Sequence, residues 1–188
     1  MNNKAEINYI IFDLELNSKV FKSSHPNEII EIGAVKIDGN LRNMGTFQSY
    51  VKPKIYRKLF PIVKRKTKIK QEDINNAPGF KEVLSSFKDW IGSNYILCSW
   101  GHDDIHHLKA NCEFNRRGTK WLKNHIDIQK QFSKLHNLPA GQRFSLKNAL
   151  NLLGIPVEND LHRADVDAKY TAEIFIRVFD KLDLRLPK

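Results

Sequence analysis

Residues 8–16 read NYIIFDLEL, an apolar run that two carboxylates, Asp13 and Glu15, interrupt. So apolar a segment is typical of a central strand covered on both faces of an α/β sheet. Side chains alternate along a strand, so Asp13 and Glu15 point to the same side near its C-terminal end. An exposed pair of acids at a strand end is the simpler alternative, but the apolar neighbours favour burial. Two like charges resist burial, and a divalent cation offsets that cost because hard cations bind carboxylate oxygens.

The rest of the chain predicts a three-layer α/β fold. A meander of three strands comes first, and the turn Asp38-Gly39-Asn40 makes its second and third strands antiparallel. Helices and one more strand then follow, so we expect a mixed central sheet flanked by helices. No composition shift marks a boundary, and residues 1–188 are expected to form a single domain. The expected strands are 9–16, 28–38, 46–52 and 95–100, and the expected helices are 80–91, 103–115, 127–136, 146–153 and 164–182.

The charge of the chain favours a polyanionic partner. Lys and Arg number 31 against 21 Asp and Glu, a formal net charge of +10, and nucleic acid is the commonest partner of such a surface. Residues 51–70 carry nine Lys or Arg and no acid, with Tyr56 and Phe60 among them. Such a segment suits phosphates and unpaired bases. The alternative is a solvated loop with Phe60 and Ile62 packed inward.

The cysteine content and the N-terminus indicate a compartment. The two cysteines, Cys98 and Cys112, form no CxxC pair and are too few for a disulfide scaffold. No signal-peptide core and no bilayer-spanning apolar stretch is visible. We therefore expect a soluble cytoplasmic protein without a membrane partner.

Further acids stand next to apolar structure at two places. Asp103 and Asp104 follow the strand at 95–100, and Asp165 and Asp167 begin the last helix. Ligand sites in α/β sheets gather outside the carboxyl ends of strands, where Asp13, Glu15 and the Asp103/Asp104 pair belong. Leu108 lies four residues after Asp104 and must pack inward, which favours Asp104 over Asp103. The pattern favours Asp167 over Asp165 only marginally.

His162 precedes the last helix, and a histidine beside carboxylates and a metal accepts a proton from water. A surface or helix-capping histidine is the alternative for His162. Taken singly, that alternative is the commoner outcome for a histidine.

The ordered set of these motifs resembles the DEDDh exonucleases, which are DnaQ-like 3′-to-5′ exonucleases with a ribonuclease H-like fold. The resemblance covers about residues 8 to 180. FDLEL at 12–16 resembles the first family motif, SWGHDDIHHL at 99–108 the second, and HRADVDAKYTAEIF at 162–175 the third. The second motif selects Asp104, and the third selects His162 and Asp167. Trp90-Ile91 and Ser99-Trp100-Gly101 resemble the branch with KapD-like proteins and the histone-mRNA 3′ exonuclease. The family often has Gly where this chain has Lys68.

The resemblance implies hydrolysis of single-stranded nucleic acid from its 3′ end to nucleoside monophosphates, with RNA favoured over DNA. Two Mg²⁺ or Mn²⁺ ions, about 3.5–4 Å apart, support such chemistry. The implied metal ligands are Asp13, Glu15, Asp104 and Asp167, with His162 as the proton acceptor. For substrate binding we expect Leu16 and Asn17 at the terminal nucleotide and Arg163 at a phosphate; Trp100 stacks on a base or packs in the core.

Two alternatives from other classes stay open. The fold could serve as a basic RNA-binding module without catalysis, although all the expected acids are present. GHDDIHH at 101–107 also resembles the ligand set of an HD-type metal phosphohydrolase. That fold is all-helical, whereas this chain begins with three predicted strands.

Overall fold

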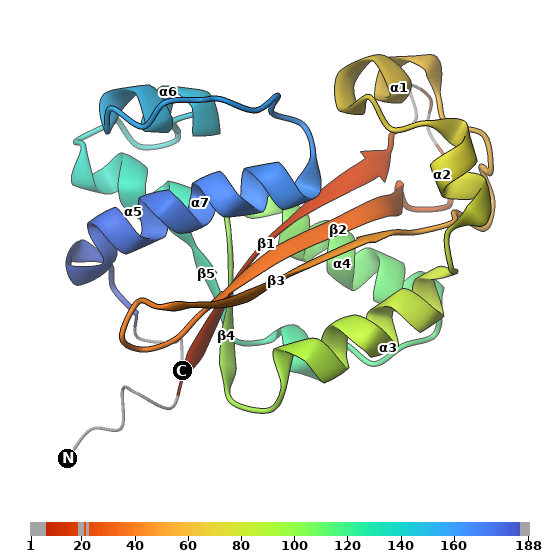
Figure 1. The fold of residues 1–188 in the computed structure, drawn as a ribbon, viewed down its shortest axis with the longest axis horizontal. Helices are drawn as coiled ribbons and strands as arrows, with labels where there is room; N and C mark the ends of the chain where they lie inside the picture. Colours follow the sequence, from red (N-terminus) through yellow and green to blue (C-terminus); the bar gives the residue numbers. More distant parts are fainter. Residues whose placement is uncertain (1–6, 19–20, 22, 185–188) are drawn as a thin grey trace.

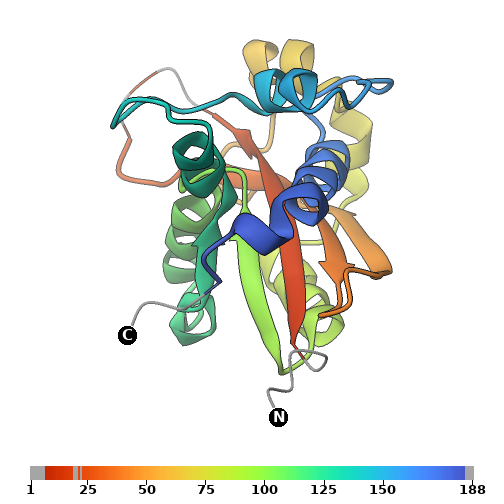
Figure 2. The same ribbon diagram turned by 90° about the vertical axis from the view of Figure 1, so that its left-hand side faces the viewer.

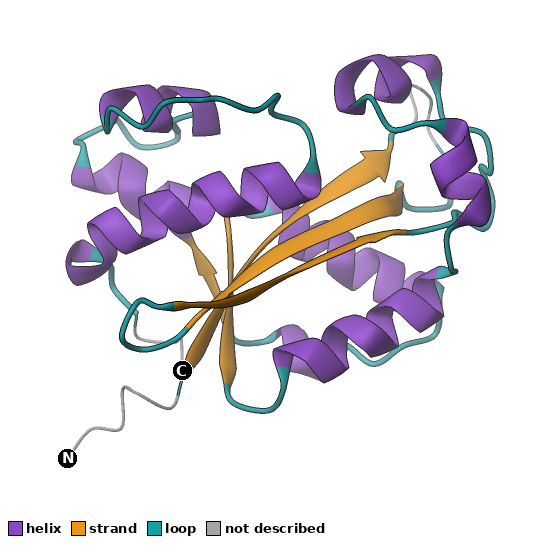
Figure 3. Cartoon of the chain, viewed as in Figure 1, coloured by secondary structure: helices purple, strands orange, loops and turns teal. Residues whose placement is uncertain are grey.

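The computed structural model describes residues 7–18, 21 and 23–184, and at its centre lies one mixed sheet (Figure 1, Figure 3). The strand order is β3-β2-β1-β4-β5. β1 pairs antiparallel with β2 and parallel with β4, so the opening apolar run is the central strand, as predicted. β2 and β3 are antiparallel, and β4 and β5 are parallel. The strands are β1 (Asn8–Asn17), β2 (Glu28–Ile37), β3 (Asn43–Tyr50), β4 (Tyr95–Ser99) and β5 (His125–Asp127).

Helices cover both faces of this sheet, with α7 on one side and α3 and α4 on the other (Figure 1, Figure 2). The α/β three-layer prediction is thus confirmed. Within the described part of the chain, every helix is too short or too polar to span a bilayer. The helices are α1 (Pro61–Thr67), α2 (Gln71–Asn76), α3 (Phe80–Ile91), α4 (Asp103–Phe114), α5 (Ile128–Leu135), α6 (Leu146–Leu152) and α7 (Ala164–Val178), with 3₁₀ turns η2 (Lys120–Leu122) and η3 (Phe179–Lys181).

The alternation of β1 divides the core into two layers. Ile10, Phe12 and Leu14 pack toward α3 and α4, whereas Tyr9 and Ile11 pack toward α7. All five side chains are buried, which explains why β1 is apolar at nearly every position. The side chains at odd-numbered positions therefore also point to the α7 side at the carboxyl end of the strand.

Several details differ from the sequence-based expectations, and the first is β3, which spans Asn43–Tyr50 instead of 46–52. The segment 51–70, read as a basic segment or loop, contains the helix α1 and runs on to α2; Pro61 suits the first turn of α1, and Val63 and Thr67 bury one face of it. β5 has only three residues, too few for a periodic signal. The last α-helix ends at Val178, and η3 completes the segment expected to be helical.

Candidate active site

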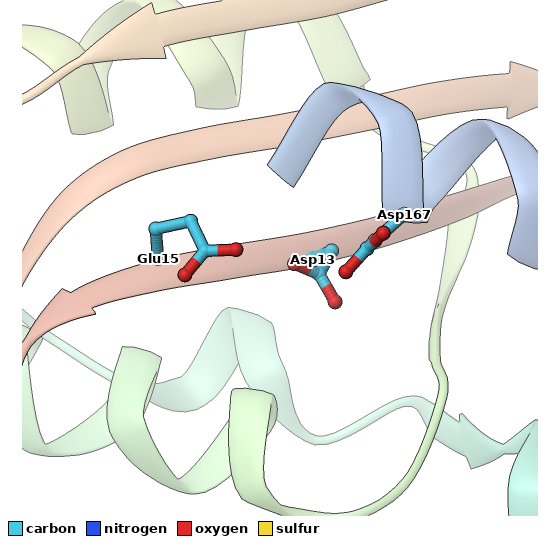
Figure 4. Close-up of side chains that lie close together, drawn as sticks. All are labelled: Asp13, Glu15 and Asp167. Atoms are coloured by element: carbon cyan, nitrogen blue, oxygen red, sulfur yellow. The ribbon is translucent and has the colours of Figure 1, made fainter. Parts of the chain in front are cut away.

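Three carboxylates from β1 and α7 converge at the carboxyl end of the central strand. Asp13, Glu15 and Asp167 each offer an oxygen, and these oxygens lie within 4.8 Å of one another (Figure 4). Glu15 is buried, and Asp13 and Asp167 are half-buried. The structure thus brings together three of the four predicted acids, from positions more than 150 residues apart in the chain.

Small residues let α7 approach the sheet closely enough for this. Gly33 of β2 pairs with Asp13, and a Cβ on Gly33 would lie 2.1 Å from the carbonyl carbon of Ala164. Ala164 and Ala168 are both fully buried at this contact. Asp167, which lies one turn into the helix, therefore reaches Asp13 and Glu15. Asp165, by contrast, pairs with Lys169 at 3.1 Å, so the geometry favours Asp167 of these two aspartates.

Asp104 lies in the first turn of α4, on the other side of β1. It is half-buried and accepts a hydrogen bond from the backbone of Leu14, whereas Asp103 is exposed. The charge of Asp104 raises the pKa of Asp13, and the charge of Asp167 in turn raises the pKa of Asp104. Its position therefore favours Asp104 over Asp103 as the fourth acid of the site.

The electrostatics of the four acids call for additional positive charge. Burial first, and then repulsion among the acids, raises the pKa of Asp13 well above its usual range. Burial likewise raises the pKa of Glu15 to about 8, of Asp104 to about 7 and of Asp167 to about 6. Lys66 of α1 lowers the pKa of Glu15 and Asp167 but does not offset the burial. A crowded set of hard oxygen donors with unbalanced charge fits a divalent cation.

A fifth acid, Glu31 of β2, stands directly opposite Glu15 in the sheet. It is completely buried, and Arg163 binds it through two hydrogen bonds of 2.7 and 3.1 Å. Gln48 and the backbone N–H of Ala164 also donate to it. Like charges opposite each other destabilise a sheet, and Arg163 neutralises only one member of this pair. Sequence reasoning missed Glu31, although a glutamate inside the apolar stretch EIIEIGAVKI was a usable signal.

Arg163 has a structural role that the sequence did not predict. Besides Glu31, its guanidinium donates to the hydroxyl of Tyr50 at 2.8 Å, just before the first residue of α7. These bonds tie the start of α7 to β2 and β3. A direct contact of Arg163 with a phosphate stays a prediction.

His162 is exposed beside the acids and has an unusual backbone. Its φ of 77° lies in the left-handed region, which non-glycine residues rarely adopt. Its backbone N–H donates to both oxygens of Asp167, at 3.2 and 3.3 Å. Partial burial and the charge of Lys66 lower the pKa of the imidazole, so the ring is neutral and able to accept a proton at neutral pH.

The other predicted binding residues divide into two groups. Asn17 is buried, donates to the carbonyls of Tyr56 and Lys58, and accepts from the N–H of Phe60, so it anchors the basic segment. Trp100 donates to the carbonyl of Phe144 and packs in the core, which is the alternative named for it above. The polar groups of both side chains thus bind neighbouring loops, and a contact of either residue with a nucleotide stays a prediction.

Leu16, however, lines a cavity of about 220 Å³ next to Glu15. The helix α1 supplies the opposite wall, including Ile62, which is 51% exposed, and Lys66. The sequence did not predict this wall, since it depends on where α1 docks. The residues that line the whole cavity are Leu14, Glu15, Leu16, Ser18, Ile62, Val63, Lys66 and Thr67.

Comparisons with known proteins agree with this architecture. Residues 10–175 match the model of the RNase T family, described as Exonuclease. The PolC-type DNA polymerase III of Clostridium perfringens is 32% identical over 178 residues, which are 93% of this chain and 11% of that protein. The 3′-5′ exoribonuclease 1 of Homo sapiens is 29% identical over 171 residues, which are 85% of this chain and 49% of that protein. The chain thus spans about a tenth and about half of these relatives.

A crystal structure gives a more complete match. The nuclease domain of 3′hExo, a DEDDh family member bound to rAMP, superposes with a TM-score of 0.84 at 25% identity. The match covers 99% of this chain and 98% of that domain. The mixed sheet also excludes the all-helical phosphohydrolase alternative. The chain therefore belongs to the RNase T exonuclease family, and its predicted kinship with the DEDDh exonucleases and its ribonuclease H-like fold are confirmed.

Proposed function

We propose that this chain is a metal-dependent 3′-to-5′ exonuclease that hydrolyses single-stranded nucleic acid to nucleoside monophosphates. The observation that carries the proposal is the convergence of Asp13, Glu15 and Asp167 within 4.8 Å in a member of an exonuclease family. A non-catalytic RNA-binding module would have no need to keep such a costly group of buried acids together.

Asp13, Glu15, Asp104 and Asp167 would hold two Mg²⁺ or Mn²⁺ ions. When bound, such ions activate a water molecule and stabilise the charge that develops on the attacking and leaving oxygens. His162 would accept the proton of the attacking water, because its lowered pKa keeps the imidazole neutral near pH 7. Its backbone N–H meanwhile holds Asp167 in place. Lys66, near Glu15 and Asp167, is placed to attract the anionic substrate.

The cavity beside Glu15 is the site that we assign to the terminal nucleoside. Leu16 and Ile62 offer apolar surfaces on which a base packs, and Lys66 lies at the same wall. We infer a preference for RNA over DNA because one relative is an exoribonuclease and a similar nuclease domain was crystallised with rAMP. The cytoplasmic location is also part of the proposal; Cys98 and Cys112 are buried free thiols, as suits a reducing compartment.

The test uses 5′-labelled single-stranded oligonucleotides in RNA and DNA versions, with Mg²⁺, with Mn²⁺ and with a chelator. We expect a ladder that shortens from the 3′ end, faster for RNA, and only when a metal ion is present. Asp13→Asn should abolish the ladder, whereas Asp89→Asn on the exposed surface of α3 should not change it. Oligonucleotide binding without shortening in either metal would reject the exonuclease and select the RNA-binding module instead.

A further inference from the structure

A second cavity lies on the opposite side of the sheet from the α7 layer. It has a volume of about 300 Å³ and lies between the start of β2, the segment after β3, the first turn of α3 and the end of α4. Four cationic side chains line this cavity: Lys52, Lys54, Arg57 and Lys81. We call the cavity and these four side chains the basic hollow. None of the four catalytic acids lines it. The hollow is therefore a separate feature of the molecule.

The cations of the basic hollow have unbalanced charge. All four are exposed, and within the described ranges none forms an ion pair. Lys54 lies over the ring of Phe114 at 5.8 Å, which leaves its charge unneutralised. Four positive charges thus face a single cavity, and charges of one sign that converge on a concavity attract a counter-ion.

The same wall contains two acids, Glu28 and Glu82, and the backbone already binds Glu28. Glu28 is 5% exposed and accepts hydrogen bonds of 2.5–3.2 Å from the N–H groups of Lys54, Ile55 and Tyr56. Glu82 folds back over Gly79 at the N-terminus of α3, where the helix dipole favours a carboxylate. Neither acid pairs with a lysine or arginine of the hollow, so an excess of two positive charges stays available.

The cations also stand on a backbone that the fold holds in place. Glu28 fixes residues 54–56, and the N–H of Lys52 donates to the carbonyl of Pro78 at 2.8 Å, which joins this segment to the start of α3. Asn17 holds residues 56–60 from the side of β1. A site whose scaffold is already ordered loses less entropy when a ligand binds.

We propose that the basic hollow binds backbone phosphates of the nucleic acid, upstream of the 3′ terminus that enters the catalytic site. This inference rests on the proposed function and extends it. The segment 51–70 carries the argument: its first part lines the hollow, and its helix α1 reaches the catalytic acids through Lys66. A single strand lying along this segment would touch both places. Phosphates are the anions that such a strand presents at every nucleotide.

The experiment measures binding in the Asp13→Asn background without metal, so that hydrolysis does not interfere. The Lys52→Ala/Lys81→Ala pair is compared with Lys120→Ala/Lys147→Ala, which removes the same charge from exposed positions outside the cavities. For an RNA of about 20 nucleotides, two lost phosphate contacts lower the slope of log K against log salt by about 1.4. We expect that change in salt slope only for the hollow pair. In that variant the affinity for the long RNA, divided by the affinity for a trinucleotide, should also be roughly tenfold smaller than in the Asp13→Asn parent.

Arginine substitutions provide the second readout. Lys52→Arg/Lys81→Arg keeps both charges and should restore the affinity and the salt slope. Equal salt slopes for the hollow pair and the control pair would overturn the inference. It would also be overturned if inorganic phosphate bound at the hollow, detected by calorimetry, while long RNA bound equally well to all variants, because the hollow would then serve a free anion.

The outcomes separate this inference from the proposed function. If the unmodified chain leaves labelled oligonucleotides intact in both metals but the hollow pair still weakens RNA binding, the exonuclease proposal fails and the hollow stands. If the chain shortens oligonucleotides while the hollow and control pairs bind alike, the exonuclease stands and the hollow fails.

Discussion

The first turn of α7 lies directly against Gly33: a Cβ on this glycine would stand 2.1 Å from the carbonyl carbon of Ala164 and 2.2 Å from the backbone nitrogen of Asp165. Backbone atoms cannot move aside as a flexible side chain does. The position of Asp167, one turn further along α7, therefore depends on the absence of a side chain at position 33. This contact sets the distance between the two halves of the proposed metal site.

Gly33→Ala should push α7 away from β2. We expect a loss of about 1–3 kcal/mol in the free energy of unfolding from overpacking, and about a 100-fold loss in exonuclease rate, since a shift near 1 Å at a catalytic group has that effect. Gly118→Ala is the matched control because a Cβ there meets nothing within 4 Å. Thermal unfolding and the oligonucleotide assay check both. An active Gly33→Ala enzyme would show that the contact does not position Asp167.

Asp104 and Asp103 are neighbours with different surroundings, so their substitutions should separate. Asp104→Asn removes a carboxylate whose charge raises the pKa of Asp13 and whose own pKa is raised by Asp167. Losing a metal ligand costs several kcal/mol of transition-state stabilisation, or about a 10²–10³-fold drop in rate. Asp103 is exposed, and Asp103→Asn should have a much smaller effect. Equal losses in kcat, or a larger loss for Asp103→Asn, would contradict the assignment of Asp104 as the fourth metal ligand.

The pKa of Glu15 predicts how stability depends on pH and on metal. Because its pKa is raised to about 8 in the folded protein, its contribution to stability is full below its ordinary pKa and is lost as the pH rises through 8. The metal-free Glu15→Gln variant should therefore gain in Tm over the unmodified chain from pH 6 to pH 8.5, with about 2–4 °C for each kcal/mol. Mg²⁺ should raise the Tm of the unmodified chain most at high pH and raise that of the variant little. Glu173→Gln, at an exposed site on α7, is the control.

The ion pair between Arg163 and Glu31 should matter for stability. Arg163→Ala leaves a completely buried carboxylate without its partner, and we expect a loss of about 3 kcal/mol in the free energy of unfolding. Arg163→Lys keeps the charge but not the paired hydrogen bonds, so an intermediate loss is expected. Arg42→Ala removes an arginine whose side chain is 71% exposed and should cost at most about 1 kcal/mol. If Arg163→Lys instead kept its Tm but raised KM, the predicted phosphate contact would be favoured.

Lys68 ends α1 with φ 59° and ψ 9°, the left-handed conformation that favours glycine after a helix. Lys68→Gly should relieve about 0.5–1 kcal/mol of strain after the entropy of the unfolded chain is included. Lys64→Gly, inside the same helix, should destabilise it by about 1 kcal/mol. Urea unfolding of both variants checks the difference in sign.

Local patterns in the sequence were sufficient for the elements that follow a period. The alternation of β1 placed Asp13 and Glu15 on one side, and helical spacing located α3 almost residue for residue. Motif resemblance then indicated Asp104, His162 and Asp167, of which Asp167 lies against the first two acids. These features depend on residues close together in the chain, whose geometry the backbone dictates.

The tertiary structure alone decided the features that depend on distant partners. The register of β2 against β1 put Glu31 opposite Glu15 and Gly33 opposite Asp13. The docking of the segment after β3 made Asn17 an anchor and divided the basic residues between the proposed catalytic site and the basic hollow. Period and composition state which face a residue takes and how much charge a segment carries. They do not state which segments meet, because strand register and loop docking follow from the packing of the whole core.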